Sequence, residues 1–361
     1  MSSSWVSRRF RWAVPGVVAI TVTGAVAAGA ASAGTTTPNV PSRTAAELIS
    51  AVAGSSATAL SGTVQESSDL GLPALPSSVA GTLGPLTLAT GTNTLRVSVD
   101  GPEKSRVALI GKLAEYDVVH SGKDVWTYSN QQNQVEHYLL PAESAGAAGS
   151  RMPGQVASTP AQAAAAALAA IDPSTQVRVG RSVMVAGRPA RQLVLTPRVA
   201  GSLVGSVRVA VDSATSVPLR VQVFSRSNAA KPAFQVGFTN ISFTKPAASV
   251  FTFTPPAGAR VRQSTVAAPT RTGAGKHAPA AHGPRSAPTT MGSGWASIVV
   301  IAHADLGALI KNRPNLLNEL TTRVATGRML STALVSVLLT DDGRLLIGAV
   351  SPSALQAAAG R

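Results

Sequence analysis

The chain has 361 residues, no cysteine and a net charge of +15, with 31 basic residues against 16 acidic ones. This length accommodates one large domain or two modest ones, and the lack of cysteine excludes disulfides and cysteine metal sites. The positive charge fits either a solvated basic surface or an anionic partner, and the compartment decides which partners are available.

Residues 1–33 have the pattern of an export signal. Three arginines precede an apolar run from Ala13 to Ala31, and Ala31-Ser32-Ala33 is a small-x-small cleavage site. We expect a signal peptide or, as the alternative, an uncleaved N-terminal anchor, and therefore an extracytoplasmic protein that is secreted or held in the cell envelope. Export argues against nucleic acid as a partner and favours an anionic membrane surface or a cell-wall polymer.

Residues 34–256 are expected to form the main domain. A polar leader is followed by apolar residues at helical spacing from Ala45 to Val52, behind a cap at Ser42 or Thr44, which predicts an amphipathic helix. Leu60–Ser67 alternates and predicts the first strand.

The segment Asp69–Leu88 is rich in leucine but interrupted by three prolines, which argues against a long helix or a central strand. Such a segment is either a lid over an apolar cavity or a loop folded onto the domain's own core.

Strands and turns then alternate regularly, which predicts an antiparallel meander. Thr159–Ile171 is alanine-rich, with Thr159 as cap and Pro160 in the first turn, and predicts a covering helix. The fold class is therefore mainly antiparallel β with α (α+β), with about eleven strands. The later strands are expected at Thr92–Val99, Ser105–Ile110, Ala114–His120, Val125–Tyr128, Val135–Leu140, Val177–Val185, Ala190–Leu195, Gly205–Val211, Leu219–Ser225, Phe234–Phe243 and Val250–Phe253.

Three ordered motifs carry a resemblance to a known family. The first lies in Val118–Leu140, where Gly122 is followed by two residues, an apolar residue, Trp126 and Tyr128. The second is Val185–Pro197 followed by Val207–Phe224, and the third is Phe238–Pro256. In this order they resemble the LolA/RseB-like family of envelope proteins, which comprises lipoprotein carriers and sigma-factor regulatory proteins.

The resemblance covers roughly residues 44–261 and implies a half-open β-barrel that holds acyl chains, with helices covering its open face. The residues that would line such a cavity are either lipid-binding or ordinary sheet core. They are Leu95, Val97, Val107, Leu109, Tyr116, Val118, Trp126, Tyr128 and Tyr138, with Leu72, Leu75, Leu83 and Leu86 in the lid.

Residues 257–291 change to a basic composition rich in proline, alanine and glycine, which predicts a linker without regular structure. Residues 292–361 are expected to form a small α+β module, which at this size should dock against the main domain. Its expected elements are a strand at Trp295–Ile301, a helix at Asp305–Thr326 broken at Pro314, strands at Leu330–Leu339 and Arg344–Val350 around a tight turn, and a terminal helix after Ser351-Pro352.

No pattern in the chain indicates catalysis. The five histidines lack suitably spaced partners, and no nucleophile elbow, phosphate loop or carboxylate pair is present. We therefore expect no enzyme activity, cofactor or metal. The hypothesis is binding, and transport, of lipid or acylated lipoprotein; the alternatives are a regulatory protein that binds a membrane anti-sigma factor through the C-terminal module, or a structural protein of the cell wall.

Overall fold

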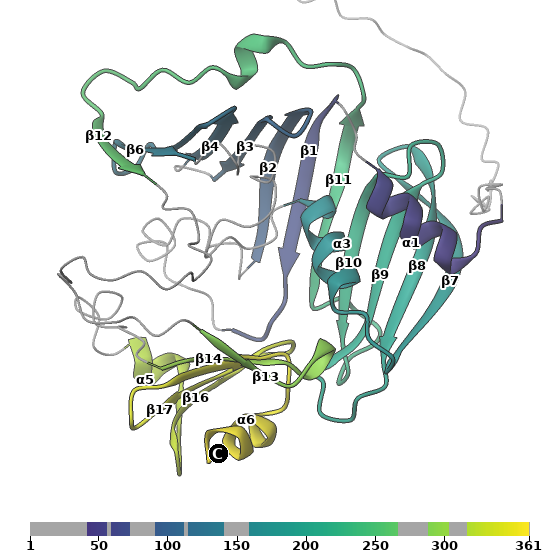
Figure 1. Cartoon of the computed structure of the whole chain (residues 1–361), viewed down its shortest axis with the longest axis vertical. Coiled ribbons are helices and arrows are strands. Elements are labelled where there is room, and N and C mark those ends of the chain that lie inside the picture. The colour runs from purple at the N-terminus through teal and green to yellow at the C-terminus, as the bar shows by residue number, and fades with distance from the viewer. Residues whose placement is uncertain are drawn as a thin grey trace, which may run out of the picture. The chain divides into compact units, whose positions relative to one another are not determined.

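The computed structural model describes residues 42–55, 59–72, 91–111, 115–140, 159–265, 288–302 and 316–360. These residues form a 12-stranded sheet, a 6-stranded sheet and a few helices (Figure 1). Within these ranges no helix is long and apolar enough to cross a bilayer.

The large sheet has the strand order β12-β6-β5-β4-β3-β2-β1-β11-β10-β9-β8-β7. Every neighbouring pair is antiparallel except β12 and β6, and the end strands β12 and β7 are not paired with each other, so the sheet is not closed. The strands are β1 Ala59–Ser68, β2 Gly91–Asp100, β3 Lys104–Ile110, β4 Glu115–Ser121, β5 Asp124–Ser129, β6 Gln134–Leu139, β7 Thr175–Val185, β8 Arg188–Pro197, β9 Val204–Asp212, β10 Pro218–Ser225, β11 Phe234–Ser242 and β12 Arg260–Thr265. The expected mainly antiparallel β fold is confirmed.

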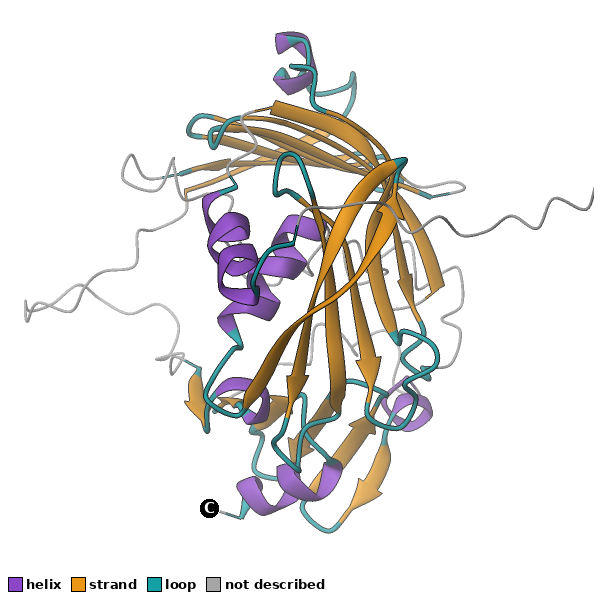
Figure 2. Ribbon diagram, turned by 90° about the vertical axis from the view of Figure 1, so that its right-hand side faces the viewer, coloured by secondary structure: helices purple, strands orange, loops and turns teal. Residues whose placement is uncertain are grey.

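Two helices pack against this sheet, and their caps are those the sequence predicted. Helix α1 (Ala45–Gly54) begins with a capping box, in which the Thr44 hydroxyl accepts from the Glu47 amide and the Glu47 carboxylate accepts from the Thr44 amide. Helix α3 (Pro160–Ala169) has Thr159 as cap and packs on β10 and β11 through small alanines. Figures 1 and 2 show both helices on the same side of β7–β11.

We call the side that carries these helices the inner face and the opposite side the outer face. The inner face holds the main apolar core, in which Leu48 of α1 and Ala164 of α3 join Leu95, Leu193 and Val236 of the sheet. The core thus extends from β2 across the sheet toward β8.

The segment that follows β11 differs from the prediction. Val250–Phe253 was expected to be a strand, but Ala248–Phe251 is a short 3₁₀ helix (η3) that contacts β3 and β4, and no strand follows it until β12. Arg260–Thr265, expected to be part of an unstructured linker, is the strand β12 and pairs in parallel with β6. We call residues 243–259, which connect β11 to β12, the strap.

The C-terminal module is a sheet of order β13-β14-β18-β17-β16-β15, with α6 packed on β17 and β18. Leu355 and Ala358 of α6 contact Ile298, Leu338 and Leu346 in a separate small core. Its elements are β13 Thr289–Met291, the 3₁₀ helix η4 Gly294–Ala296, β14 Ile298–Ile301, α5 Leu316–Leu320, β15 Thr322–Val324, β16 Gly327–Ser331, β17 Ser336–Thr340, β18 Leu345–Gly348 and α6 Pro352–Ala359.

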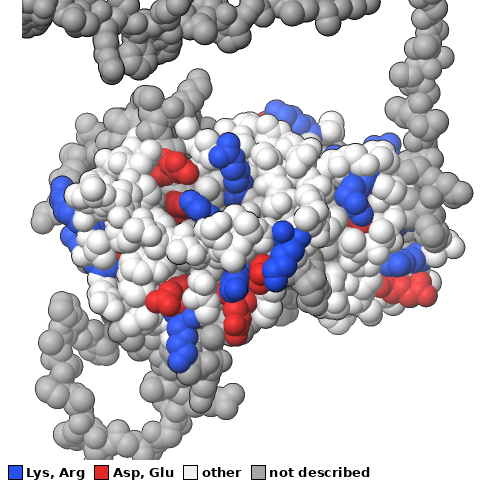
Figure 3. All heavy atoms as spheres, turned by 90° about the horizontal axis from the view of Figure 1, so that it is seen from above, with Lys and Arg blue, Asp and Glu red and all other residues white. Residues whose placement is uncertain are grey.

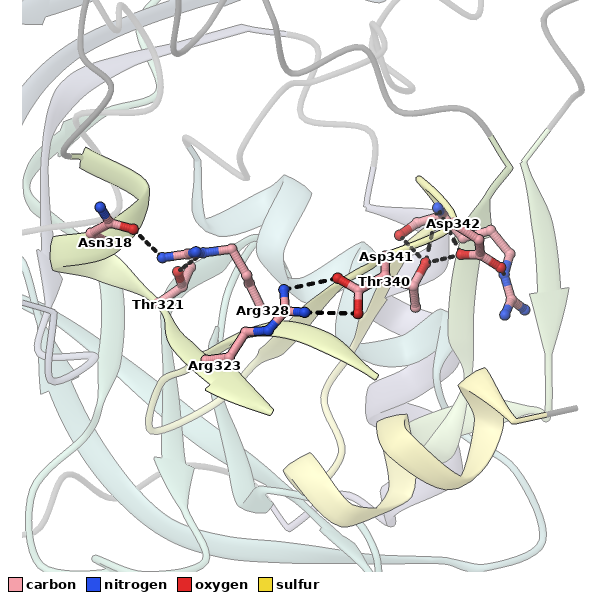
Figure 4. A network of polar contacts seen from close by, with 8 residues as sticks. Asn318, Thr321, Arg323, Arg328, Thr340, Asp341 and Asp342 are labelled. Atoms are coloured by element: carbon pink, nitrogen blue, oxygen red, sulfur yellow. Dashed lines mark hydrogen bonds and ion pairs between the residues drawn. The ribbon is translucent and has the colours of Figure 1, made fainter. Parts of the chain in front are cut away.

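Three expectations for this module were wrong in detail. Thr322–Val324 is a strand rather than the end of a helix, because its β-branched residues pair with β16 across a tight turn. Leu330–Leu339 is divided between β16 and β17 by a turn, and Trp295 lies in η4 before the strand. Figure 4 shows polar contacts that hold this sheet, including the paired hydrogen bonds of Arg323 to Asp341 at 2.8 and 3.0 Å.

The module contacts the large sheet at several points. The indole Nε1 of Trp295 donates to Thr175 Oγ1 at 2.8 Å, and the Ala333 amide donates to the Leu70 carbonyl at 2.9 Å. Ser202 forms an isolated antiparallel bridge with Val350, and the side chains of Trp295 and Leu334 are buried in the core of the large sheet.

Candidate functional site

Most of the predicted lining residues do share one face, because they occupy facing positions on three neighbouring strands. Leu95 of β2 faces Leu109 of β3, which faces Tyr116 of β4. This cross-strand row lies on the inner face, where Leu95 is 1% exposed and the other two are half-buried.

A second row runs parallel to the first. Val97 of β2 faces Val107 of β3, which faces Val118 of β4. Val97 is buried, and Val107 and Val118 are half-buried. The same row continues with Thr127 of β5 and Glu136 of β6, so the inner face changes from apolar to polar across the sheet.

The polar end of this face is a hydrogen-bonded cluster. The Tyr138 hydroxyl donates to Glu136 Oε2, Gln134 Nε2 donates to Glu136 Oε1 at 3.1 Å, and Tyr116 lies on the same face. The hydrogen bond to Glu136, together with burial and the carboxylate charge, raises the pKa of Tyr138 to about 12. Burial also raises the pKa of Tyr116, so both phenols keep their protons at neutral pH and can serve as hydrogen-bond donors.

A buried acid on the same face was not predicted. Glu66 of β1 is 0% exposed and accepts hydrogen bonds from Ser68 Oγ at 2.6 Å and Asn93 Nδ2 at 2.7 Å. Burial raises its pKa, although both hydrogen bonds act in the opposite direction. The alternation of Leu60, Val64 and Glu66 along β1 was the signal that could have placed this carboxyl among the inner residues.

Trp126 and Tyr128 do not belong to this face, and their expected place in the lining was wrong. The hairpin after β4 pairs Val119 with Trp126 and Asp117 with Tyr128, so these aromatic rings share the outer face with Asp117 and Val119. Side chains alternate along each strand, and Val118 therefore lies opposite Thr127 on the inner face.

These outer rings hold the strap. Phe253 lies with its ring centre 5.5 Å from that of Trp126 and 6.1 Å from that of Tyr128, and His137 stacks on Trp126 at 3.8 Å. Arg106 also contacts the strap. Its guanidinium is paired with Asp117 and donates to the Val250 carbonyl at 3.3 Å.

The predicted lid falls almost entirely outside the described residues. Leu75, Leu83 and Leu86 lie there, and their role stays a prediction. Leu72 is half-buried at the end of the described segment, two residues after Leu70, which packs against the core. In the described ranges no group of three histidine, cysteine, aspartate or glutamate side chains is arranged to hold a metal ion.

One protein family matches the chain. Residues 85–262, just under half of the chain, match the model of a family described as "Predicted periplasmic protein (DUF2092)". No curated protein matches the chain.

Three solved structures are similar to the chain at low identity. The MucA/MucB complex of Pseudomonas aeruginosa is 16% identical over 87% of this chain and 96% of that chain, with a TM-score of 0.46. An uncharacterized conserved protein from Thermus thermophilus is 16% identical over 61% and 99%, with a TM-score of 0.35. A LolA superfamily protein from Nitrosomonas europaea is 13% identical over 59% and 99%, with a TM-score of 0.25. Structures of MucB and of a LolA superfamily protein are thus among those similar to the chain, in agreement with the resemblance that the motifs carry, and at these identities the likeness concerns the fold alone.

Proposed function

We propose that this protein, whose residues 85–262 match a family of predicted periplasmic proteins, binds lipid or lipoprotein acyl chains on the inner face outside the cytoplasm. The observation that carries the proposal is the row Val97–Val107–Val118, which passes into Thr127 and Glu136 on the same face. An amphiphile needs such an arrangement, with apolar side chains for its tail beside hydrogen-bonding groups for its head.

The energetics favour the tail as the main source of affinity. Each CH₂ group removed from water contributes about 0.8 kcal/mol, so a long acyl chain brings far more free energy than the few polar groups at Glu136 and Tyr138. Those groups would instead set the orientation of the ligand.

Uptake of a fluorescent fatty acid by the native protein tests this proposal. Leu109→Ala removes three carbons from the half-buried Leu109 side chain and should weaken uptake by up to about 60-fold. Leu345→Ala makes the same change at a half-buried position of β18 in the C-terminal module and should leave uptake unchanged.

Trp126→Ala gives a second contrast, since its ring lies on the outer face under Phe253. It should leave uptake intact. Loss of uptake in Trp126→Ala but not in Leu109→Ala would show that the acyl chain does not occupy the inner face, and no uptake by the wild-type protein would refute the proposal.

A regulatory role is the second candidate, because the C-terminal module has an apolar face that α6 does not cover. Val299, Ile347, Val337 and Leu330 form a cross-strand row on the side opposite Leu338 and Leu346, and Val299 is 37% exposed. MucB is solved in complex with MucA, and by analogy a membrane anti-sigma factor would be the partner here.

Co-purification of the full-length protein with its envelope membrane proteins tests this second role. Val299→Asp should abolish capture of an anti-sigma factor without affecting fatty-acid uptake. Val261→Asp, at a valine that is 51% exposed on β12, is the matched control, and equal loss in both variants would count against the module as the binding site.

A further inference from the structure

Within the large sheet, the positive charge is concentrated in the half that contains β7–β11. Residues 159–250, which contain β7–β11, carry ten lysines and arginines and only two acids. Residues 59–140, which contain β1–β6, carry five basic residues and eight acids. Figure 3 shows basic and acidic side chains interspersed on the face seen from above, so that face is not predominantly basic.

Arginine and glutamine side chains gather on the outer face of β7–β11. Arg178 of β7 and Arg208 of β9 lie in one cross-strand row on either side of Val194, and this row continues with Gln222 and Gln235. The guanidinium of Arg208 lies over the Phe224 ring at 4.1 Å, which fixes its position.

A second row runs beside the first and contains Arg220. Gln192 of β8 faces Ala210 of β9, which faces Arg220 of β10, and Arg181 lies opposite Gln192 in the irregular part of β7. The stem of Arg220 lies against Gly237 of β11, where an added Cβ would come within 2.9 Å of it. A glycine is therefore required for Arg220 to lie flat on the sheet.

Arg220 lacks a counter-ion among the described residues. Its Nε atom is buried without a hydrogen-bond partner there, and its pKa is lowered by burial and by the charge of Arg181. A guanidinium in this state is stabilised by any anion that reaches it.

The two acids of this half of the sheet are already engaged. Asp212 is fully buried and accepts paired hydrogen bonds from Arg188 at 2.7 and 2.9 Å. Asp172 accepts hydrogen bonds from Ser174 and Thr175 in the turn before β7. Neither carboxylate compensates the charge of the arginines on the outer face. Helices α1 and α3 do not cover these arginines either, because both pack on the inner face (Figures 1 and 2).

We propose that the outer face of β7–β11 docks onto an anionic phospholipid surface, with Arg178, Arg181, Arg208 and Arg220 binding phosphate groups. The planar guanidinium forms paired hydrogen bonds with phosphate oxygens, and the four arginines on β7, β9 and β10 form an open surface rather than a closed pocket. This site lies on the opposite side of the sheet from the acyl-chain row, and it does not depend on the function proposed above.

Co-sedimentation of the full-length protein with vesicles tests the proposal. Binding is expected to vesicles of phosphatidylcholine with phosphatidylglycerol and not to phosphatidylcholine alone, and to fall as salt is added. Arg178→Gln with Arg181→Gln, two exposed positions, should weaken binding roughly 30-fold. Arg260→Gln with Arg262→Gln removes the same charge from two exposed positions of β12 and should change binding little.

Three outcomes would overturn this proposal. Equal binding to both kinds of vesicle would exclude recognition of phosphate charge, and equal loss in the two double variants would assign binding to net charge rather than to this face. Competition by inorganic phosphate at constant ionic strength would indicate a site for a small anion instead of a membrane. Fatty-acid uptake should be unchanged by Arg178→Gln with Arg181→Gln, which separates this test from that of the inner face.

Discussion

Asp212 is a buried acid whose charge is held by several hydrogen bonds. Its side chain is 0% exposed, and besides Arg188 it accepts from the amide of Thr215 at 2.8 Å and the hydroxyl at 2.7 Å. Burial alone would raise the pKa of Asp212, but the hydrogen bonds from Arg188 and Thr215 outweigh it and hold the pKa below its ordinary value. The carboxylate therefore stabilises the folded chain only while it is ionised.

The lowered pKa of Asp212 should make the free energy of unfolding depend on pH. Because its pKa is lowered on folding, the contribution of Asp212 is fully present above the ordinary aspartate value of about 3.9 and is lost as the pH falls through the lowered value. Asp212→Asn should lower the free energy of unfolding by roughly 3 kcal/mol at neutral pH and reduce its acid dependence, which urea unfolding at neutral and acidic pH measures.

The exposed pair of Lys231 and Asp69 supplies the control. Its side chains are 69% and 56% exposed, and Asp69→Asn should change stability by less than about 1 kcal/mol. An Asp212→Asn protein with the same acid dependence as the wild type would show that another group controls it.

At the scale of secondary structure, the strap leads into β12, a strand that lies in the predicted linker and joins the large sheet. Phe251 is 3% exposed and Phe253 packs on Trp126, and Asn133 then fixes the start of β12 by donating to the Gly258 carbonyl at 3.0 Å. The Arg260 amide donates to the Asn133 carbonyl at 2.9 Å. These contacts lead the chain to the edge of β6.

Phe253→Ala is expected to release this element. Loss of the half-buried ring should destabilise the protein by about 1 to 3 kcal/mol and free β12, so trypsin should cleave faster after Arg260 and Arg262. Phe243→Ala, at another half-buried phenylalanine near the start of the strap, should leave this cleavage unchanged. Unaltered cleavage in Phe253→Ala would mean that β12 is held by its strand pairing alone.

Local sequence patterns predicted most strands of the large sheet, because each short segment contains its own alternation of apolar and polar residues and its own turn residues. Long-range pairing was not visible in this way. The parallel ladder of β12 with β6 joins residues far apart in the chain, and its arginines resemble those of the linker that follows. The side of the sheet on which Trp126 lies could have been predicted from the sequence. A two-residue turn at Gly122-Lys123 pairs Ser121 with Asp124, and this register places Val119 opposite Trp126.

On the scale of the whole molecule, the contacts between the two sheets determine whether the chain unfolds as one unit. Leu334, in the turn between β16 and β17, is 7% exposed and belongs to the core of the large sheet rather than to that of its own module. The neighbouring Ala333 amide is bonded to Leu70, where the leucine-rich segment after β1 begins. A module of this size has only a small core of its own, and the shared core adds to it.

Leu334→Ala should therefore uncouple the two sheets. The cavity should lower the free energy of unfolding by about 3 kcal/mol, and loss of this anchor should let the module unfold before the large sheet. Hydrogen exchange would then show faster opening of β16–β18 at a denaturant concentration where β8 and β9 remain protected. Trp295→Phe, which removes the hydrogen bond to Thr175 and part of the buried ring but keeps an aromatic side chain, should lower the free energy of unfolding by about 1 to 2 kcal/mol without separating the transitions. Coincident opening of both sheets in Leu334→Ala would show that the backbone bridge between Ser202 and Val350 is sufficient to couple them.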